Sequence, residues 1–224
     1  MQNLAEKFQR RTTTDVVFDQ LHEEIVSLTL LPGTKISEAD VASRFGVSRQ
    51  PVHDAFNRLE NQDLLLIRPQ KATKVRGFSM QSIAQARFVR MAVELEVIRR
   101  ACLIWDDARA DKLEQNLELQ QHSLKDIDAF HAHDYQFHRL ICELSDCQLA
   151  YKTIEECKKK VDRLCILSLG KGNELTAVID DHRRIAEALK SRSVEEASAV
   201  ARRHFNHLDD TITYIHETHS EYFE

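Results

Sequence analysis

Apolar side chains recur at helical spacing through most of the chain. Between about residues 15 and 27 they form one stripe, which predicts a first helix. Two shorter helices are predicted next, and the first of them is capped by Ser37 and ends at Gly46. The second runs over residues 49–61, with its apolar side chains on one face. Two short helices joined by a tight, glycine-containing turn are typical of a helix-turn-helix.

The pattern changes to a β-hairpin and then returns to helices. Two short β-prone runs, residues 64–68 and 73–76, flank a polar turn. Beyond Gly77 the helical period continues almost to the end, with Gly170 and Gly172 as the clearest break. The helices predicted there span residues 80–105, 109–124, 127–145, 148–169, 174–190 and 194–220.

These elements predict a mainly α protein with two domains. Residues 1–77 would form a winged helix-turn-helix whose wing is the small β-hairpin. Residues 78–224 would form an antiparallel, all-α bundle of about six helices.

Charge is distributed unevenly between these two parts. The formal net charge of the chain is −5, but residues 1–78 hold 11 Lys and Arg against 10 Asp and Glu. DNA binding is therefore compatible with a local basic surface on the first part. The candidate DNA contacts are Arg44, Ser48, Arg49, Gln50, His53 and Asn57 around the second short helix, with Lys71 and Lys74 near the hairpin turn. The alternative is that the two short helices are core helices of some other helical domain.

Other sequence features indicate the compartment. No apolar run approaches the roughly 18 residues that span a bilayer, and the first residues lack the apolar segment of a secretory signal. Five scattered cysteines include no Cys-x-x-Cys pair. These features predict a cytoplasmic protein with reduced thiols and no membrane association.

The first part resembles the winged-helix domain of the GntR family of bacterial regulators. The residues that carry the resemblance are Leu31-Pro32-Gly33, Val47-Ser48-Arg49-Gln50-Pro51-Val52, Ala55, Arg58-Leu59-Glu60 and Leu64. The resemblance implies binding to double-stranded DNA. Family members typically carry Arg-Glu where this chain has His53-Asp54, and glycines where it has Asp63 and Ala72. The arginine of that Arg-Glu pair usually touches DNA, and His53 stands in its place here. The operator preference of other family members therefore does not transfer to this chain.

A separate group of residues in the second part has the chemistry of a metal site. Asp134 and His138 stand four residues apart, so they project from one face of a helix. His182 and His204 lie on or beside apolar stripes of two later helices. One carboxylate and three imidazoles could hold a divalent ion with open positions for water or ligand. The alternative is that the histidines are hydrogen-bonded packing residues.

Residues 79–220 resemble the FCD ligand-binding domain of the FadR subfamily of GntR regulators. The matching residues are Arg90, Glu94, Asp126, Asp134, His138, His182, Ala186 and Ala197 to His204. The resemblance implies that the Asp-His-His-His set binds a divalent metal at the floor of an effector pocket, with zinc expected first and nickel or manganese as alternatives. The chain has Cys147 at the position after the Asp134–His138 helix where family members usually have asparagine.

A metal with open positions would take an oxygen of a carboxylate or hydroxyl, and an arginine would bind the other end. Arg90 is the first candidate for this arginine, Arg87 the second, and His131 a further lining residue. The alternative for either arginine is an ion pair with Glu94 or Glu96.

Together these features predict a ligand-responsive bacterial transcriptional regulator, in most family members a repressor, of catabolic genes. It would not be an enzyme. A homodimer would bind a near-palindromic operator, and the effector would be a small carboxylate: a sugar acid, a hydroxy acid or a dicarboxylate. The alternatives are a direct sensor of the divalent metal and a metal-dependent hydrolase.

Overall fold

The structure is a computed structural model that describes residues 11–168 and 174–224. The chain divides into two compact units. The first unit extends through Phe78 and includes Glu221–Glu224, and the second unit is Ser79–Ser220. The break predicted at Gly170 and Gly172 lies outside the described residues.

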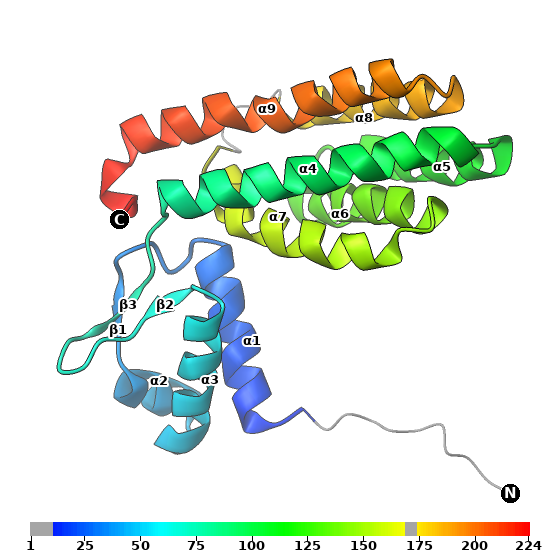
Figure 1. Ribbon diagram of the computed structural model, residues 1–224. Helices are drawn as coiled ribbons and strands as arrows, with labels where there is room; N and C mark the ends of the chain where they lie inside the picture. Colours follow the sequence, from blue (N-terminus) through cyan, green and yellow to red (C-terminus); the bar gives the residue numbers. More distant parts are fainter. Residues whose placement is uncertain (1–10, 169–173) are drawn as a thin grey trace, which may run out of the picture. The chain divides into compact units, whose positions relative to one another are not determined.

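The first unit is a winged helix-turn-helix, as the sequence predicts (Figure 1). Its elements are α1 (Thr13–Val26), β1 (Lys35–Ile36), α2 (Glu38–Phe45), α3 (Arg49–Asn61), β2 (Leu65–Leu66) and β3 (Thr73–Val75). The core of this unit is formed mainly by the apolar faces of α1 and α3, where Leu21, Phe56 and Leu59 are fully buried. This packing leaves the opposite face of α3 exposed.

Local signals explain the ends of α2 and α3. The Ser37 hydroxyl accepts a hydrogen bond from the backbone N–H of Asp40 at 3.1 Å. Gly46 ends α2 with φ at 65°, a left-handed conformation that costs glycine little. Ser48 occupies the N-cap position of α3, but its side chain makes no capping hydrogen bond.

The wing contains one more strand than the sequence predicts. The three strands are antiparallel in the order β1-β3-β2, with Leu65 opposite Val75 and Lys35 opposite Lys74. β1 has only two residues, which is too short to show an alternating pattern. Its pairing continues at Thr34, whose carbonyl accepts a hydrogen bond from the Val75 N–H at 2.9 Å.

Two segments that are far apart in the sequence meet in the first unit. Phe78 donates its N–H to the Tyr222 carbonyl at 2.8 Å, and its own carbonyl accepts from the Glu224 N–H at 3.0 Å. The Phe78 and Phe223 rings lie 5.4 Å apart. A Cβ on Gly77 would approach the Tyr222 carbonyl oxygen to 2.8 Å, so this position requires glycine.

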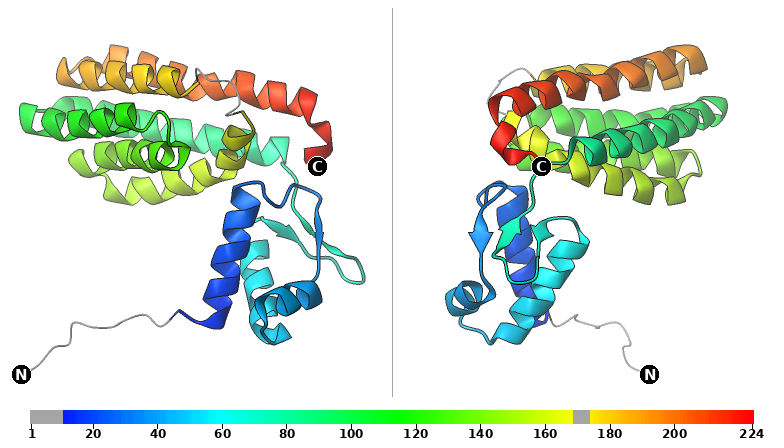
Figure 2. Two further views of the ribbon diagram at one scale, coloured as in Figure 1. Left: turned by 180° about the vertical axis from the view of Figure 1, so that it is seen from behind. Right: turned by 60° about the vertical axis from the view of Figure 1, so that its left-hand side comes forward.

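The second unit is the predicted helical bundle (Figure 2). Its helices are α4 (Met80–Ile104), α5 (Asp107–His122), α6 (Ile127–Leu144), α7 (Gln148–Ser168), α8 (Glu174–Lys190) and α9 (Val194–Thr218). The long α4 packs against α7 and α9, while α5 packs against α6 and α8. Trp105, Leu113, Phe137 and Leu189 are fully buried in the core that results. None of the described helices is both long and apolar enough to cross a membrane.

Candidate functional site

The predicted metal-ligand residues converge in the core of the second unit. His138 on α6, His182 on α8 and His204 on α9 offer ring nitrogens that all lie within 4.8 Å of one another. The Oδ1 atom of Asp134 lies 3.6 Å from Nε2 of His182 and 3.8 Å from Nε2 of His138. All four side chains are buried. Three helices therefore bring three imidazoles together, with the Asp134 carboxylate beside two of them.

Neighbouring groups fix two of the imidazole rings. Nδ1 of His138 lies 2.6 Å from a Glu94 carboxylate oxygen, and Nδ1 of His182 lies 2.8 Å from the amide oxygen of Gln120. Since both oxygens only accept, each Nδ1 carries the proton and each Nε2 is left with a free lone pair or one that accepts a hydrogen bond. Phe137 stacks on His182 with ring centroids 3.9 Å apart, which holds the ring plane.

The protonation states suit a cation. Burial lowers the pKa of His182 to about 3 and holds the pKa of His204 well below its ordinary value. Burial alone would raise the pKa of Asp134, but the ammonium of Lys158, which also hydrogen-bonds to it, outweighs burial and holds that pKa well below the usual range. The site therefore presents neutral imidazoles beside an ionised carboxylate, which is the form in which these side chains bind metals.

The two distances from Asp134 fit a divalent metal, and the three imidazole nitrogens lie within 4.8 Å of one another. Two ligands that each lie about 2.0–2.2 Å from one zinc ion are at most about 4.4 Å apart, and the Asp134–imidazole distances of 3.6 and 3.8 Å satisfy this limit. Within the described part of the chain, Nε2 of His182 is buried without a hydrogen-bond partner, which a metal would supply. At His138 a metal would replace a hydrogen bond from Arg90.

Two cations already lie against these ligands. Nζ of Lys158 is 2.5 Å from Oδ2 of Asp134 and 3.7 Å from Asp162. Burial alone would lower the pKa of Lys158, but the two carboxylates outweigh it and raise that pKa. Arg90 donates from Nε to Glu94 at 2.6 Å and from Nη2 to Nε2 of His138 at 3.1 Å.

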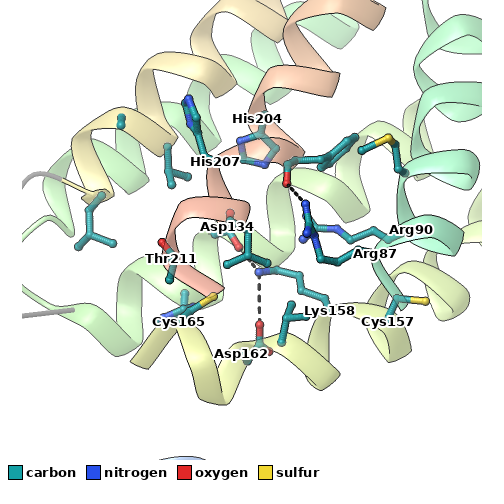
Figure 3. A pocket seen from close by; sticks show the side chains of 18 of the residues that line it. Arg87, Arg90, Asp134, Cys157, Lys158, Asp162, Cys165, His204, His207 and Thr211 are labelled. Carbon is teal, nitrogen blue, oxygen red and sulfur yellow. Dashed lines mark hydrogen bonds and ion pairs between the residues drawn. The ribbon is translucent and has the colours of Figure 1, made fainter. Parts of the chain in front are cut away.

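The site opens onto a cavity of about 340 Å³ in the second unit (Figure 3). Of the four candidate ligands, Asp134 and His204 line it. The three predicted effector contacts, Arg87, Arg90 and His131, line it too. Each arginine also has an acidic partner: Arg90 pairs with Glu94, one of the two predicted alternatives, whereas Arg87 pairs with Asp209.

The predicted DNA contacts are all exposed in the first unit. They are Arg44, Ser48, Arg49, Gln50, His53, Asn57, Lys71 and Lys74. Among the residues that the structure describes, no ion pair engages Arg49, Lys71 or Lys74, so these cations are available to phosphates and bases. His53 lies 2.8 Å from Glu38 and 3.2 Å from Asn57.

Comparison with known proteins decides the family. The family described as "Bacterial regulatory proteins, gntR family" matches residues 13–75, and the family described as "FCD domain" matches residues 85–207. The chain belongs to the GntR family. The HTH-type transcriptional repressor RspR of Escherichia coli (strain K12) is 34% identical over 209 residues, which is 92% of each chain. The gluconate operon transcriptional repressor of Bacillus subtilis (strain 168) is 26% identical over 214 residues, 92% of this chain and 88% of its own.

Solved structures agree with this GntR fold. E. coli McbR/YncC superposes with a TM-score of 0.68 at 19% identity, covering 92% of this chain and 98% of its own. A putative GntR regulator from Rhodococcus sp. RHA1 gives a TM-score of 0.69 at 20% identity, covering 89% and 97%. The GntR chain is thus a transcriptional regulator and not an enzyme, which removes the hydrolase alternative.

The sequence did not identify three residues of this GntR regulator's site. Lys158 lies in a run of three lysines, where nothing distinguishes the buried one. Gln120 carries no charge or metal-ligand signal, and Asp162 lies one turn after Lys158 like any helical ion pair. Their roles depend on tertiary packing around Asp134 and His182.

Proposed function

We propose that this GntR-family regulator is a cytoplasmic repressor of catabolic genes that responds to a small organic or sugar acid. The observation that carries the proposal is the convergence of Asp134 and three imidazoles beside a cavity lined by Arg87, Arg90 and Lys158. Metal ligands and cations on one cavity suit an anionic ligand. The names of two relatives, RspR and the gluconate operon repressor, support repression.

The four buried side chains Asp134, His138, His182 and His204 would hold the metal, with zinc first and nickel or manganese as alternatives. When bound, the metal would supply a Lewis-acidic position for an oxygen of the effector. Arg90 and Arg87 would bind the effector's carboxylate, and His131 would line the same wall.

On the DNA side, α3 would enter the major groove. Arg49, Gln50 and Asn57 are exposed near its beginning and along its outer face, where side chains reach base edges. Lys71 and Lys74 would contact phosphates or the adjacent minor groove. A homodimer would place two such helices on a near-palindromic operator, about one helical turn apart.

The effector would regulate DNA binding only by binding one arrangement of the dimer better than another. A direct metal sensor uses the same site, and operator affinity distinguishes the two. With zinc present, a small acid should weaken operator binding at fixed salt. A chelator alone that abolishes operator binding, with full recovery on adding metal, would favour the metal sensor.

The metal site has its own test. The double variant His182→Ala with His204→Ala should purify without stoichiometric metal, whereas the wild type should hold about one divalent ion per chain, as elemental analysis would measure. His133→Ala is the matched control, because His133 lies on α6 outside the cluster. Stoichiometric metal in the double variant would exclude the site.

A further inference from the structure

The cavity in the second unit is chemically asymmetric. Figure 3 shows Arg87 and Arg90 on one side of Asp134, and Cys165 and Thr211 on the other. The three cationic side chains that line the cavity, Arg87, Arg90 and Lys158, come from α4 and α7. The cavity therefore has a cationic end, formed by these three residues, which also includes the metal-ligand residue Asp134.

Apolar side chains line much of the remaining wall. They come from four helices and include Phe130, Val161, Leu175, Val178, Phe205 and Leu208. We refer to these six residues as the apolar wall. Thr211 and His207 are polar groups away from the cationic end, and His207 is already 2.9 Å from Asp181. A ligand lying along the apolar wall would therefore meet mainly carbon atoms, although His131 and Asp210 also line the cavity.

Acidic side chains in the cavity disfavour a second carboxylate on the ligand. Asp162 and Asp210 both line it. Asp162 already accepts a hydrogen bond from the Tyr135 hydroxyl and pairs with Lys158. A second anionic group near Asp210 would meet like charge, because the three cations of the cavity lining lie at the cationic end.

We propose that the effector is a monocarboxylic acid with an apolar body. Its carboxylate would bind at the cationic end beside Asp134, and its body would pack on the apolar wall. The inference rests on the proposed acid response and narrows its ligand class away from sugar acids and dicarboxylates. A cavity of about 340 Å³ is at the small end of ligand sites, which suits a small acid.

The energetic reason is the desolvation of hydroxyl groups. A sugar acid carries a hydroxyl on nearly every carbon, and each one buried against the apolar wall would lose its hydrogen bonds to water. One such unpaired group weakens binding by about tenfold or more. An alkyl or aryl body instead gains affinity for each methylene that leaves water.

Hexanoate and gluconate form a matched pair for the test, because both are six-carbon monocarboxylates and only gluconate carries hydroxyls on its chain. Titration calorimetry on the zinc-loaded full chain should give a Kd at least tenfold lower for hexanoate. Hexanamide, which has the same body without the charge, should bind at least tenfold more weakly than hexanoate. Adipate, with a second carboxylate, should also bind more weakly.

A variant tests the location of the body. Val178→Thr keeps the shape of the side chain but places a hydroxyl on the apolar wall, so hexanoate should weaken several-fold while gluconate does not. Val200→Thr, on α9 and outside the cavity lining, is the control and should change neither ligand.

The results separate the two proposals. If gluconate or adipate binds more tightly than hexanoate, the apolar-acid inference is overturned while an acid effector stands. If none of the three acids binds the zinc-loaded protein, both the inference and the proposed acid response fail. Equal loss of hexanoate binding in Val178→Thr and Val200→Thr would also overturn the inference.

Discussion

Glu94 is a single buried carboxylate with two partners. One oxygen accepts from Arg90 and the other from His138, each at 2.6 Å. Burial alone would raise its pKa, but these two partners outweigh it and lower the pKa of Glu94 to about 2. The side chain thus orients a candidate metal ligand and holds an arginine of the cavity wall at the same time.

Glu94→Gln should therefore change the pH dependence of stability. A lowered carboxyl pKa stabilises the fold above the unfolded value near 4.5, and this contribution is lost as the pH falls toward 2. The shift corresponds to roughly 3 kcal/mol. In urea unfolding, the variant should be less stable than wild type by about this amount at pH 7, with the difference shrinking between pH 4.5 and 3. Glu96→Gln, exposed and paired with Arg99, should have little effect at any pH.

Lys158 neutralises Asp134 and also competes with a metal for it. Lys158→Met should make the metal-free protein less stable by about 3 kcal/mol, because Asp134 stays buried without its cation. Zinc should bind the variant more tightly than wild type, since no ammonium repels the ion. A competition titration against a zinc-binding dye measures this. Lys159→Met, whose side chain is 60% exposed, is the control, and weaker zinc binding by Lys158→Met would contradict the assignment.

At the scale of elements, helix ends were the most predictable feature, because their signals are local. Ser37 and Gly46 occupy the capping positions expected of them, and Asp126 and Ser193 likewise cap α6 and α9. The two-residue strand β1 was not predicted, because so short a segment has no period and depends on its partner β3. Spacing and family resemblance suggested the four candidate ligands, but their convergence depends on how α6, α8 and α9 pack.

The recognition helix α3 and the wing should contribute differently to DNA binding. Arg49→Ala should weaken binding to an operator selected from random duplexes by about 1–3 kcal/mol, because the proposed base contact would be lost. Lys71→Ala should weaken binding to all duplexes similarly and reduce the slope of log K against log salt by about 1. Fluorescence anisotropy over a salt series measures both. Normal operator affinity in Arg49→Ala would show that α3 is not the reading helix.

At the scale of the whole molecule, the proposed homodimer needs an apolar surface. On α4 of the second unit, Phe88 is 76% exposed and Leu103 is 61% exposed. Phe88 is the most exposed aromatic side chain in the described part of the chain, and aromatic side chains are enriched at protein interfaces, whereas a singly exposed leucine is ordinary. A second copy of the chain is the partner we propose for this face.

Phe88→Asp should therefore shift the protein from dimer to monomer in sedimentation velocity. Operator affinity should fall as well, because two linked recognition helices bind far better than one. Leu149→Asp changes a side chain that is 83% exposed on α7 and should leave the dimer intact. A dimeric Phe88→Asp variant would place the interface elsewhere.

The hydrogen bonds between Phe78 and the segment 221–224 affect how the chain is made. Domains generally fold in the order in which they are synthesised. Here the first unit lacks the partners of the Phe78 backbone until all six helices of the second unit have left the ribosome. Chains that stop inside the bundle would carry a DNA-binding unit without its final residues. The backbone of Phe78 therefore gains these two hydrogen bonds only after the whole bundle has been synthesised.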